Sequence, residues 1–179
     1  MCHIENFVLK TINPKPNLYL RYVDDIFVDV DGEEQLEKLR MMMEKRSCLR
    51  FTVERCISNK IPFLDVWVDG SEGTFKTSVY RKPSNSGKCL NGDSECPMKY
   101  KTSVIRAYVS RAFKICSDWP LLHHELNRIR QILTNNGYSM VEIDREIKTK
   151  MSKFNEGLNK QNDSKNPINI FYQNTFSSS

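Results

Sequence analysis

Residues 18–30 read LYLRYVDDIFVDV, two short runs of β-branched and aromatic residues separated by two adjacent aspartates. Such runs, interrupted by turn-forming residues, predict a β-hairpin with Asp24 and Asp25 at its tip. Two carboxylates held side by side repel each other, and a divalent cation that prefers oxygen ligands, such as Mg²⁺, relieves this repulsion. The alternative interpretation is an ordinary Asp-Asp turn that binds no metal.

The sequence on both sides of this hairpin predicts a unit rich in strands. The residues up to about Lys10 are expected to end a helix, which the prolines that follow cannot continue. After the hairpin, Asp31 with Glu34 three residues later is typical of a helix N-terminus, and this helix is expected to reach Arg46. Strands are then expected at residues 49–56, 63–68 and 75–80, with a turn at 70–73 between the last two.

Beyond residue 97 the pattern becomes helical. Apolar residues at three- and four-residue spacing predict three helices. Their boundaries are expected near Pro120, at Asn136-Gly137 and at Ser139, which forms a capping-box pattern with Glu142. Residues 83–97 are expected to be an irregular connector that a partner could order. The predicted fold class is α+β, with antiparallel β-hairpins and one helix followed by a three-helix bundle.

The charges are distributed unevenly along the chain. Residues 98–154 hold eleven Lys or Arg and five Asp or Glu, a net charge of +6, whereas residues 1–97 carry a net charge of −1. A basic part next to a part with clustered aspartates is what a metal-dependent enzyme acting on nucleic acid would show. A solvated, lysine-rich helical surface is the alternative.

Other features of the composition narrow the class of protein. No apolar run approaches the roughly 18 residues of a membrane span, and no secretory signal pattern is present. The six cysteines include no CxxC pair, which favours reduced thiols and a nuclear or cytoplasmic location over a disulfide framework. Cys89 and Cys96, with Cys116 and two histidines downstream, lack the tight spacing of most zinc sites.

Several motifs occur in a fixed order along residues 1–154. They are Tyr22-Val23-Asp24-Asp25, Phe51-Thr52-Val53-Glu54, Ile61-Pro62-Phe63-Leu64-Asp65-Val66, Ser78-Val79-Tyr80-Arg81-Lys82-Pro83, Arg111-Ala112 and Asn136-Gly137-Tyr138. This series resembles the C-terminal palm and helical thumb of the Penelope-like reverse transcriptases, a class of retroelement RNA-directed DNA polymerases. The helical part also resembles the helix-turn-helix-type region of these animal element proteins.

The resemblance implies domains and roles for particular residues. Residues 1–82 would be the C-terminal part of the palm, 83–97 the connector, 98–154 the helical thumb and 155–179 a polar, disordered tail. Asp24 and Asp25 would be the catalytic, Mg²⁺-binding carboxylates. Tyr22, Arg81 and Lys82 would contact nucleotide or primer. The basic residues expected to follow the phosphates of an RNA template and DNA primer are Lys99, Lys101, Arg106, Arg111 and Lys114.

The resemblance also indicates what this chain lacks. Two-metal nucleotidyl transfer in this family needs a further palm aspartate and nucleotide-clamping fingers, which would precede Met1. The chain is therefore expected to be a reverse transcriptase fragment that binds Mg²⁺ weakly or not at all and does not polymerise alone. Two alternatives are a non-catalytic, nucleic-acid-binding helical module and an active minimal polymerase.

Overall fold

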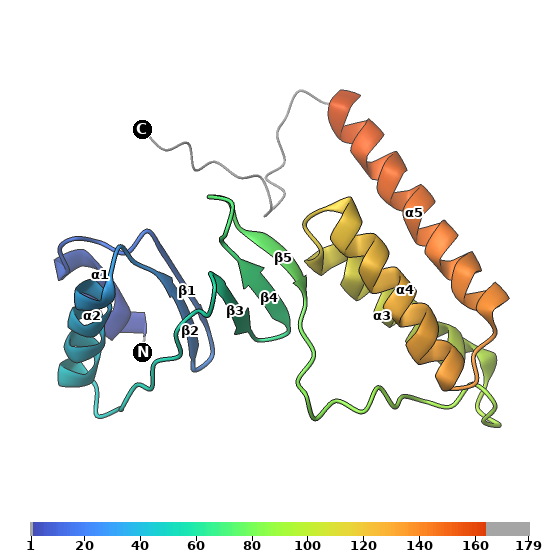
Figure 1. Ribbon diagram of the computed structural model, residues 1–179, viewed down its shortest axis with the longest axis horizontal. Helices are drawn as coiled ribbons and strands as arrows, with labels where there is room; N and C mark the ends of the chain where they lie inside the picture. Colours follow the sequence, from blue (N-terminus) through green and yellow to red (C-terminus); the bar gives the residue numbers. More distant parts are fainter. Residues whose placement is uncertain (1, 164–179) are drawn as a thin grey trace. The chain divides into compact units, whose positions relative to one another are not determined.

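The computed structural model describes residues 2–163, and within this range five helices and two antiparallel sheets confirm the α+β prediction (Figure 1). The chain divides after Arg55 into a first unit, residues 1–55, and a second unit, residues 56–179. Each unit has its own hydrophobic core.

The first unit packs two helices and a hairpin around a small core. Its elements are α1 (Cys2–Thr11), β1 (Leu18–Tyr22), β2 (Asp25–Asp29) and α2 (Glu33–Arg46). Val8 of α1 and Ile12, which directly follows α1, meet Leu39 and Met43 of α2, and all four side chains are at most 5% exposed. The inward-facing side chains of β2 pack against this cluster. The predicted hairpin and both helices are therefore confirmed.

Two local predictions in the first unit are wrong. The hairpin turn consists of Val23 and Asp24, because Tyr22 pairs with Asp25 across the strands. Asp31 does not cap α2, which begins after Gly32 without a side-chain cap. The Asp31 carboxylate instead accepts a hydrogen bond from the Asn17 side chain (2.8 Å), so it fastens the base of the hairpin.

The predicted strand at residues 49–56 is also wrong, since this segment is irregular. The backbone groups of a strand form hydrogen bonds with a neighbouring strand. In this segment, side chains of α2 bind one backbone group and one arginine side chain instead. The Phe51 N–H donates to Glu44 (2.9 Å), and the Arg55 guanidinium pairs with Glu33. The segment therefore follows α2 instead of joining a sheet.

The second unit begins with a three-stranded antiparallel sheet in the order β3 (Lys60–Phe63), β4 (Val66–Asp69) and β5 (Lys76–Val79). The single strand predicted at residues 63–68 is wrong. Leu64 adopts a positive φ of 56° and starts a two-residue turn that the composition gave no reason to expect, since Gly, Asn and Asp dominate such positions. The predicted turn between β4 and β5 is confirmed, with Gly73 at a φ of 72°.

Three helices follow, as predicted, and pack against one another: α3 (Met98–Ile115), α4 (Trp119–Asn135) and α5 (Met140–Asp163). The largest fully buried side chains of the bundle are Ile105, Val109, Ile129, Leu133 and Ile143. Asp118 caps α4 by accepting a hydrogen bond from the Leu121 N–H (2.9 Å). The helix α5 continues to Asp163, past the predicted start of the tail, and residues 164–179 of that tail lie outside the described residues.

Hydrogen bonds and one buried ion pair fasten the sheet to the bundle. At the outer edge of β5, the Thr77 carbonyl accepts from the Ser117 N–H, and the Thr77 N–H donates to the Ser117 hydroxyl, both at 3.0 Å. Just beyond β5, the Arg81 guanidinium forms a two-pronged pair with Glu125 of α4; one of its contacts, Nη1 to Oε2, is 2.9 Å. Both side chains are at least nine-tenths buried, so this pair closes the interface between sheet and helices.

The connector has no helix or strand, but it is ordered by the α4–α5 turn. The Asn136 side chain donates a hydrogen bond to the Gly87 carbonyl (2.9 Å) and accepts one from the Cys89 N–H (3.1 Å). The backbone carbonyl of Asn136 accepts a further hydrogen bond from the Gly92 N–H (2.7 Å). A Cβ atom on Gly92 would lie 2.4 Å from the Gly137 oxygen, so the two backbones touch. Gly137 itself has a φ of 81°, typical of a residue after a helix end.

A membrane-spanning segment is not found among residues 2–163, because none of their helices is both long and apolar enough to cross a bilayer.

We predict that Gly92→Ala destabilises the second unit by about 1–3 kcal/mol, because the new methyl group collides with backbone that cannot rotate away. Both tryptophans, Trp67 and Trp119, lie in the second unit, so urea unfolding followed by tryptophan fluorescence reports on it alone. Gly157→Ala is the matched control: its Cβ meets nothing within 4 Å, and it should leave stability unchanged or raise it by up to about 1 kcal/mol. Equal unfolding curves for the two variants would contradict the close approach.

We also predict that Arg81→Met lowers the free energy of unfolding by about 3–5 kcal/mol, because it leaves the Glu125 carboxylate buried without a partner. The double variant Arg81→Met with Glu125→Leu should recover much of this loss. Lys76→Met removes the cation of an exposed pair with Glu72 and should cost less than about 1 kcal/mol in the same fluorescence assay. A loss no larger than that of Lys76→Met would show that the buried pair does not hold the sheet on the bundle.

Candidate nucleic-acid interface

The hairpin tip of the first unit presents the predicted catalytic residues to solvent. Tyr22, Asp24 and Asp25 are all exposed. Val23, between Tyr22 and Asp24, has a φ of 55°. This backbone conformation costs a β-branched residue on the order of 1–3 kcal/mol. The Val23 carbonyl accepts a hydrogen bond from Arg21 (2.7 Å), which helps to hold this turn.

Asp24 and Asp25 together offer too few ligands for the expected two-metal chemistry. Two ions about 3.5–4 Å apart require several carboxylates around them. Within residues 2–163, no group of three or more His, Cys, Asp or Glu side chains is placed to hold a metal ion. The side chains described here therefore do not fit a two-metal centre.

The residues expected to meet primer beyond β5 differ in their surroundings. Arg81 is engaged by Glu125 inside the second unit, whereas Lys82 is exposed. Asp65 lies in the β3–β4 turn and pairs with Arg111 of α3 (3.2 Å). Arg111 also donates to the Tyr80 carbonyl at 3.4 Å.

The five basic residues predicted on α3 fall into two groups. Arg106 and Arg111 make ion pairs within the second unit, Arg106 with Glu146 of α5 (2.8 Å). Lys99, Lys101 and Lys114 have no ion-pair partner among residues 2–163. The two arginines therefore connect elements of the second unit, whereas the three lysines can contact a ligand.

The acids of the bundle are largely neutralised from within. Glu125 and Glu146 are buried, and each is paired with an arginine. Asp144 pairs with Arg130 of α4 at 2.8 Å, and Asp118 accepts the capping hydrogen bond of α4. The carboxylates that would repel an anionic ligand are therefore mostly hidden or compensated.

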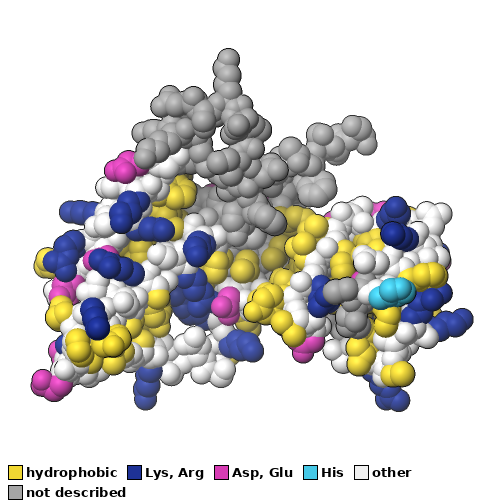
Figure 2. Space-filling model, turned by 180° about the vertical axis from the view of Figure 1, so that it is seen from behind, with side chains coloured by type: hydrophobic (Ala, Val, Ile, Leu, Met, Phe, Trp, Pro, Cys, Tyr) yellow, Lys and Arg dark blue, Asp and Glu magenta, His cyan; other side chains and the backbone are white. Residues whose placement is uncertain are grey.

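What remains on the bundle surface is a set of cations without an ion-pair partner in the described part of the chain. They are Lys99, Lys101, Lys114, Arg128, Arg145, Lys148, Lys150 and Lys153. On the face of the molecule shown in Figure 2, Lys and Arg side chains lie over the helical part, with Asp and Glu side chains at several places among them. With a net charge of +6 over residues 98–154, the surface of the bundle carries an excess of positive charge.

The last two helices form a helix-turn-helix arrangement. Four residues, 136–139, separate α4 from α5, and the turn contains Gly137, a length and composition typical of this motif. Tyr138 in the turn, Leu133 before it and Ile143 after it are core side chains that are at most 4% exposed. Buried packing and the contacts of Asn136 thus fix where α5 begins.

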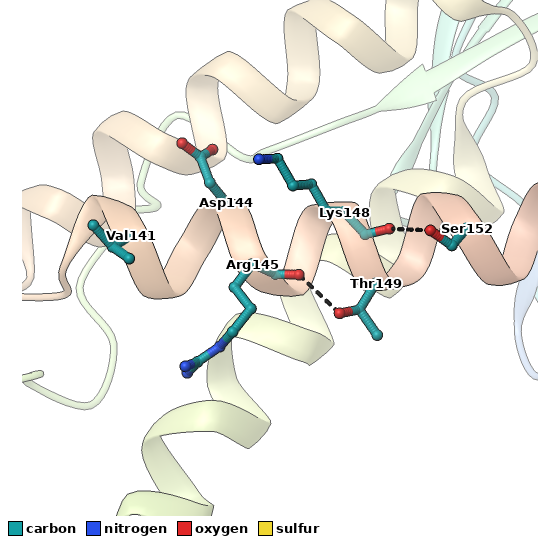
Figure 3. Close-up of a pocket in the computed structure, with 6 residues that line it drawn as sticks. All are labelled: Val141, Asp144, Arg145, Lys148, Thr149 and Ser152. Atoms are coloured by element: carbon teal, nitrogen blue, oxygen red, sulfur yellow. Dashed lines mark hydrogen bonds between the residues drawn. The ribbon is translucent and has the colours of Figure 1, made fainter.

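The outer face of α5 is polar and basic. A shallow depression runs along it, lined by Val141, Asp144, Arg145, Lys148, Thr149 and Ser152 (Figure 3). The Thr149 hydroxyl donates to the Arg145 carbonyl (2.9 Å), and the Ser152 hydroxyl donates to the Lys148 carbonyl (3.1 Å). These small side chains lie close to the helix, while Arg145 and Lys148 extend from it.

The residues of this α5 face are not among the predicted site residues, although the sequence contains the signal for them. Arg145, Lys148 and Ser152 recur at three- and four-residue spacing, opposite the apolar stripe of Ile143 and Ile147. Arg128 similarly lies on α4 away from the buried Leu126 and Ile129. The helical periodicity that predicts the core residues also predicts which polar residues lie on the opposite side of each helix. Applied in this way, it identifies Arg128, Arg145, Lys148 and Ser152.

Within residues 2–163, no group of three or more His, Cys, Asp or Glu side chains that includes the cysteines near the bundle is placed to hold a metal ion. Burial raises the pKa of the Cys89 thiol and raises that of Cys116 to about 11.

Comparison with known proteins identifies one family over part of the chain. Residues 89–148 match the family model described as the animal helix-turn-helix domain, and no curated protein or solved structure matches the chain. The match starts in the connector, at the residue whose N–H donates to Asn136, and includes α3, α4 and the first third of α5. Over these residues, the second unit is similar to the animal helix-turn-helix domain.

Proposed function

We propose that the second unit binds nucleic acid through contacts between the basic side chains of its bundle and backbone phosphates. The observation that carries the proposal is the internal pairing of Glu125, Glu146 and Asp144, which leaves the exposed cations of a helix-turn-helix domain uncompensated. The expected location is the nucleus or cytoplasm, where nucleic acid is present.

The arrangement favours phosphate contacts from more than one helix. Lys99 and Lys114 are exposed on α3, and Arg128 is exposed on α4. Lysine and arginine that neutralise phosphates release condensed counterions, so affinity falls steeply as salt concentration rises. Such contacts position a protein on nucleic acid without reading its sequence.

The triple variant of Lys99, Lys114 and Arg128 to Gln is predicted to bind nucleic acid more weakly than the unmodified chain. The plot of log affinity against log salt concentration should become shallower, by up to about one unit for each phosphate that the variant no longer neutralises. Fluorescence anisotropy with labelled DNA and RNA, single-stranded and duplex, from about 50 to 200 mM salt measures this.

A charge-matched control lies in the first unit, where Lys10, Lys15 and Lys45 are also exposed. Changing these three to Gln alters net charge by the same amount and should leave the slope nearly unchanged. Equal effects of the two triple variants would mean that overall charge, and not the bundle surface, governs binding. Salt-independent binding, or none, would reject the proposal.

A second candidate function is that of a reverse transcriptase fragment of the Penelope-like class, favoured by the strained Val23 at the tip of an exposed Tyr22-Val23-Asp24-Asp25 turn. Strained backbone occurs preferentially where function requires it. Two carboxylates do not form a two-metal centre, so no polymerase chemistry is assigned to this chain, and Mg²⁺ binding at the turn belongs to the same hypothesis.

Primer extension on an RNA template with Mg²⁺ tests this candidate. The unmodified chain is predicted to add no nucleotides beyond the background of an Asp24→Asn variant, because too few ligands surround the turn. Extension that depends on Asp24 would instead establish an active polymerase.

A further inference from the structure

We propose that an unpaired base of a single-stranded nucleic acid stacks on the exposed ring of Trp119 and that the strand continues along the adjacent side of α4. This inference rests on the nucleic-acid binding proposed for the second unit and assigns its substrate class, a single strand. Proteins that hold single strands combine aromatic side chains, on which bases stack, with cations that contact the backbone phosphates. The end of the bundle at which α4 begins carries both kinds of side chain.

Trp119 belongs to an aromatic cluster with Phe113 of α3 and Phe154 of α5. The Trp119 and Phe154 rings meet edge to face, with centroids 6.0 Å apart and 89° between their planes, and the Phe113 and Phe154 centroids are 5.5 Å apart. Phe113 is buried in the bundle core, whereas Trp119 is 52% exposed. An edge-to-face contact covers at most one face of the indole. With half of the side chain exposed, a face of the indole is therefore open to a base.

The backbone around Trp119 is fixed before any ligand binds. Asp118 caps α4, and Pro120, the residue after Trp119, has a φ that its ring restricts. Ser117 is bonded to Thr77 of β5 through both its N–H and its hydroxyl, each at 3.0 Å. The ring contacts of the aromatic cluster restrict the side chain as well. An aromatic side chain that is already ordered loses little conformational freedom when a base stacks on it.

A second exposed ring follows on the same side of α4. His123 lies one turn after Trp119, which places their Cβ atoms about 5–6 Å apart, and it is exposed. Its Nδ1 atom lies 3.4 Å from Nδ2 of Asn127, and the Asn127 Oδ1 atom accepts a hydrogen bond from Arg130 (2.8 Å). Arg130 pairs with Asp144 of α5, and Trp119 also contacts α5, so this side of α4 faces α5. A strand laid along it meets two rings in succession.

The charge around the aromatic cluster favours a ligand that carries phosphates. Lysines lie next to the cluster in the chain or one helical turn away from it, and they are Lys114, Lys150 and Lys153. The same stretches, residues 113–119 and 150–157, contain two acids, Asp118 and Glu156. Asp118 accepts the capping hydrogen bond of the Leu121 N–H at 2.9 Å. The excess of lysine around exposed rings is the composition of a base-stacking site and not of a purely apolar surface for a protein segment.

The two tryptophans of the chain allow the contact to be measured directly. Trp67 also forms an edge-to-face pair, with Tyr80 (5.0 Å between centroids), and is 37% exposed, so it is the matched control for Trp119. In the full chain, Trp67→Phe leaves Trp119 as the fluorescent reporter, and Trp119→Phe leaves Trp67. A single-stranded thymidine oligonucleotide should quench the fluorescence of the first variant and leave that of the second nearly unchanged.

Two further probes separate stacking from phosphate binding. An abasic oligonucleotide of the same length keeps the phosphates and lacks the bases, and in a long duplex the bases are stacked on one another. Both should bind in a salt-sensitive way and leave the fluorescence of Trp119 unchanged. A uridine oligoribonucleotide shows whether the strand is RNA or DNA, and quenching of Trp119 by either sugar type supports the stacking contact.

Variants without the rings test the affinity. Trp119→Leu keeps an apolar side chain next to Phe154 and should weaken binding of the thymidine oligonucleotide by about fivefold or more. Its affinity for the abasic oligonucleotide should not change, whereas a variant that merely failed to fold would lose both affinities. His123→Ala should also weaken binding of the thymidine oligonucleotide. His124→Ala, at the neighbouring exposed position on a different side of α4, is its control.

The outcomes distinguish this inference from the function on which it rests. Equal quenching by the duplex or the abasic oligonucleotide, or unchanged affinity of Trp119→Leu, would overturn the stacking site and leave phosphate binding intact. Fluorescence of Trp119 that changes with protein concentration alone, together with a dimer in sedimentation, would also overturn it, because a second copy would then occupy the site. The absence of salt-sensitive binding to any nucleic acid would reject both.

Discussion

A carboxylate can be buried only with a cation or several hydrogen-bond donors beside it, and this constraint shapes the second unit. Glu125 and Glu146 are each less than a tenth exposed, and each is met by an arginine from another element. One pair joins the sheet to α4 and the other joins α3 to α5. The same pairs remove two negative charges from the surface of the bundle. The two buried Arg–Glu pairs therefore hold the elements of the second unit together and also leave its surface more positive.

Asn136 and Gly137 fix the backbone of the turn between α4 and α5. Asn136 ends α4 and satisfies backbone groups of three connector residues, and Gly137 takes the positive φ that allows the chain to turn into α5. The connector is irregular, yet the hydrogen bonds of Gly87, Cys89 and Gly92 to Asn136 hold it against the turn. This explains why the helix-turn-helix family match begins at Cys89, nine residues before α3. The later part of the connector, residues 89–97, lies within the matched region and is bonded to the turn.

The sequence predicted the features that depend on neighbouring residues, such as helices and their ends. It predicted less well the features that depend on contacts between distant residues. Periodic apolar residues predicted all three bundle helices, and Asn136-Gly137 predicted the end of α4, because helix cores and helix ends depend on near neighbours. The strand at 49–56 failed because Glu44 and Glu33 bind that segment. The α3 cations were predicted as one set, but Arg106 and Arg111 find acids 40 or more residues away.

The two units therefore differ in how much of their chemistry is present in the described residues. A metal site depends on ligands that converge on one point, and the hairpin of the first unit brings only Asp24 and Asp25 to its tip. A phosphate-binding surface depends on an excess of cations spread over a rigid body, a condition that does not require a closed ligand set. The bundle meets that condition, because its acids are paired internally and its helices are fixed by a continuous core. The nucleic-acid binding proposed for the second unit for this reason requires no ligands from outside the bundle.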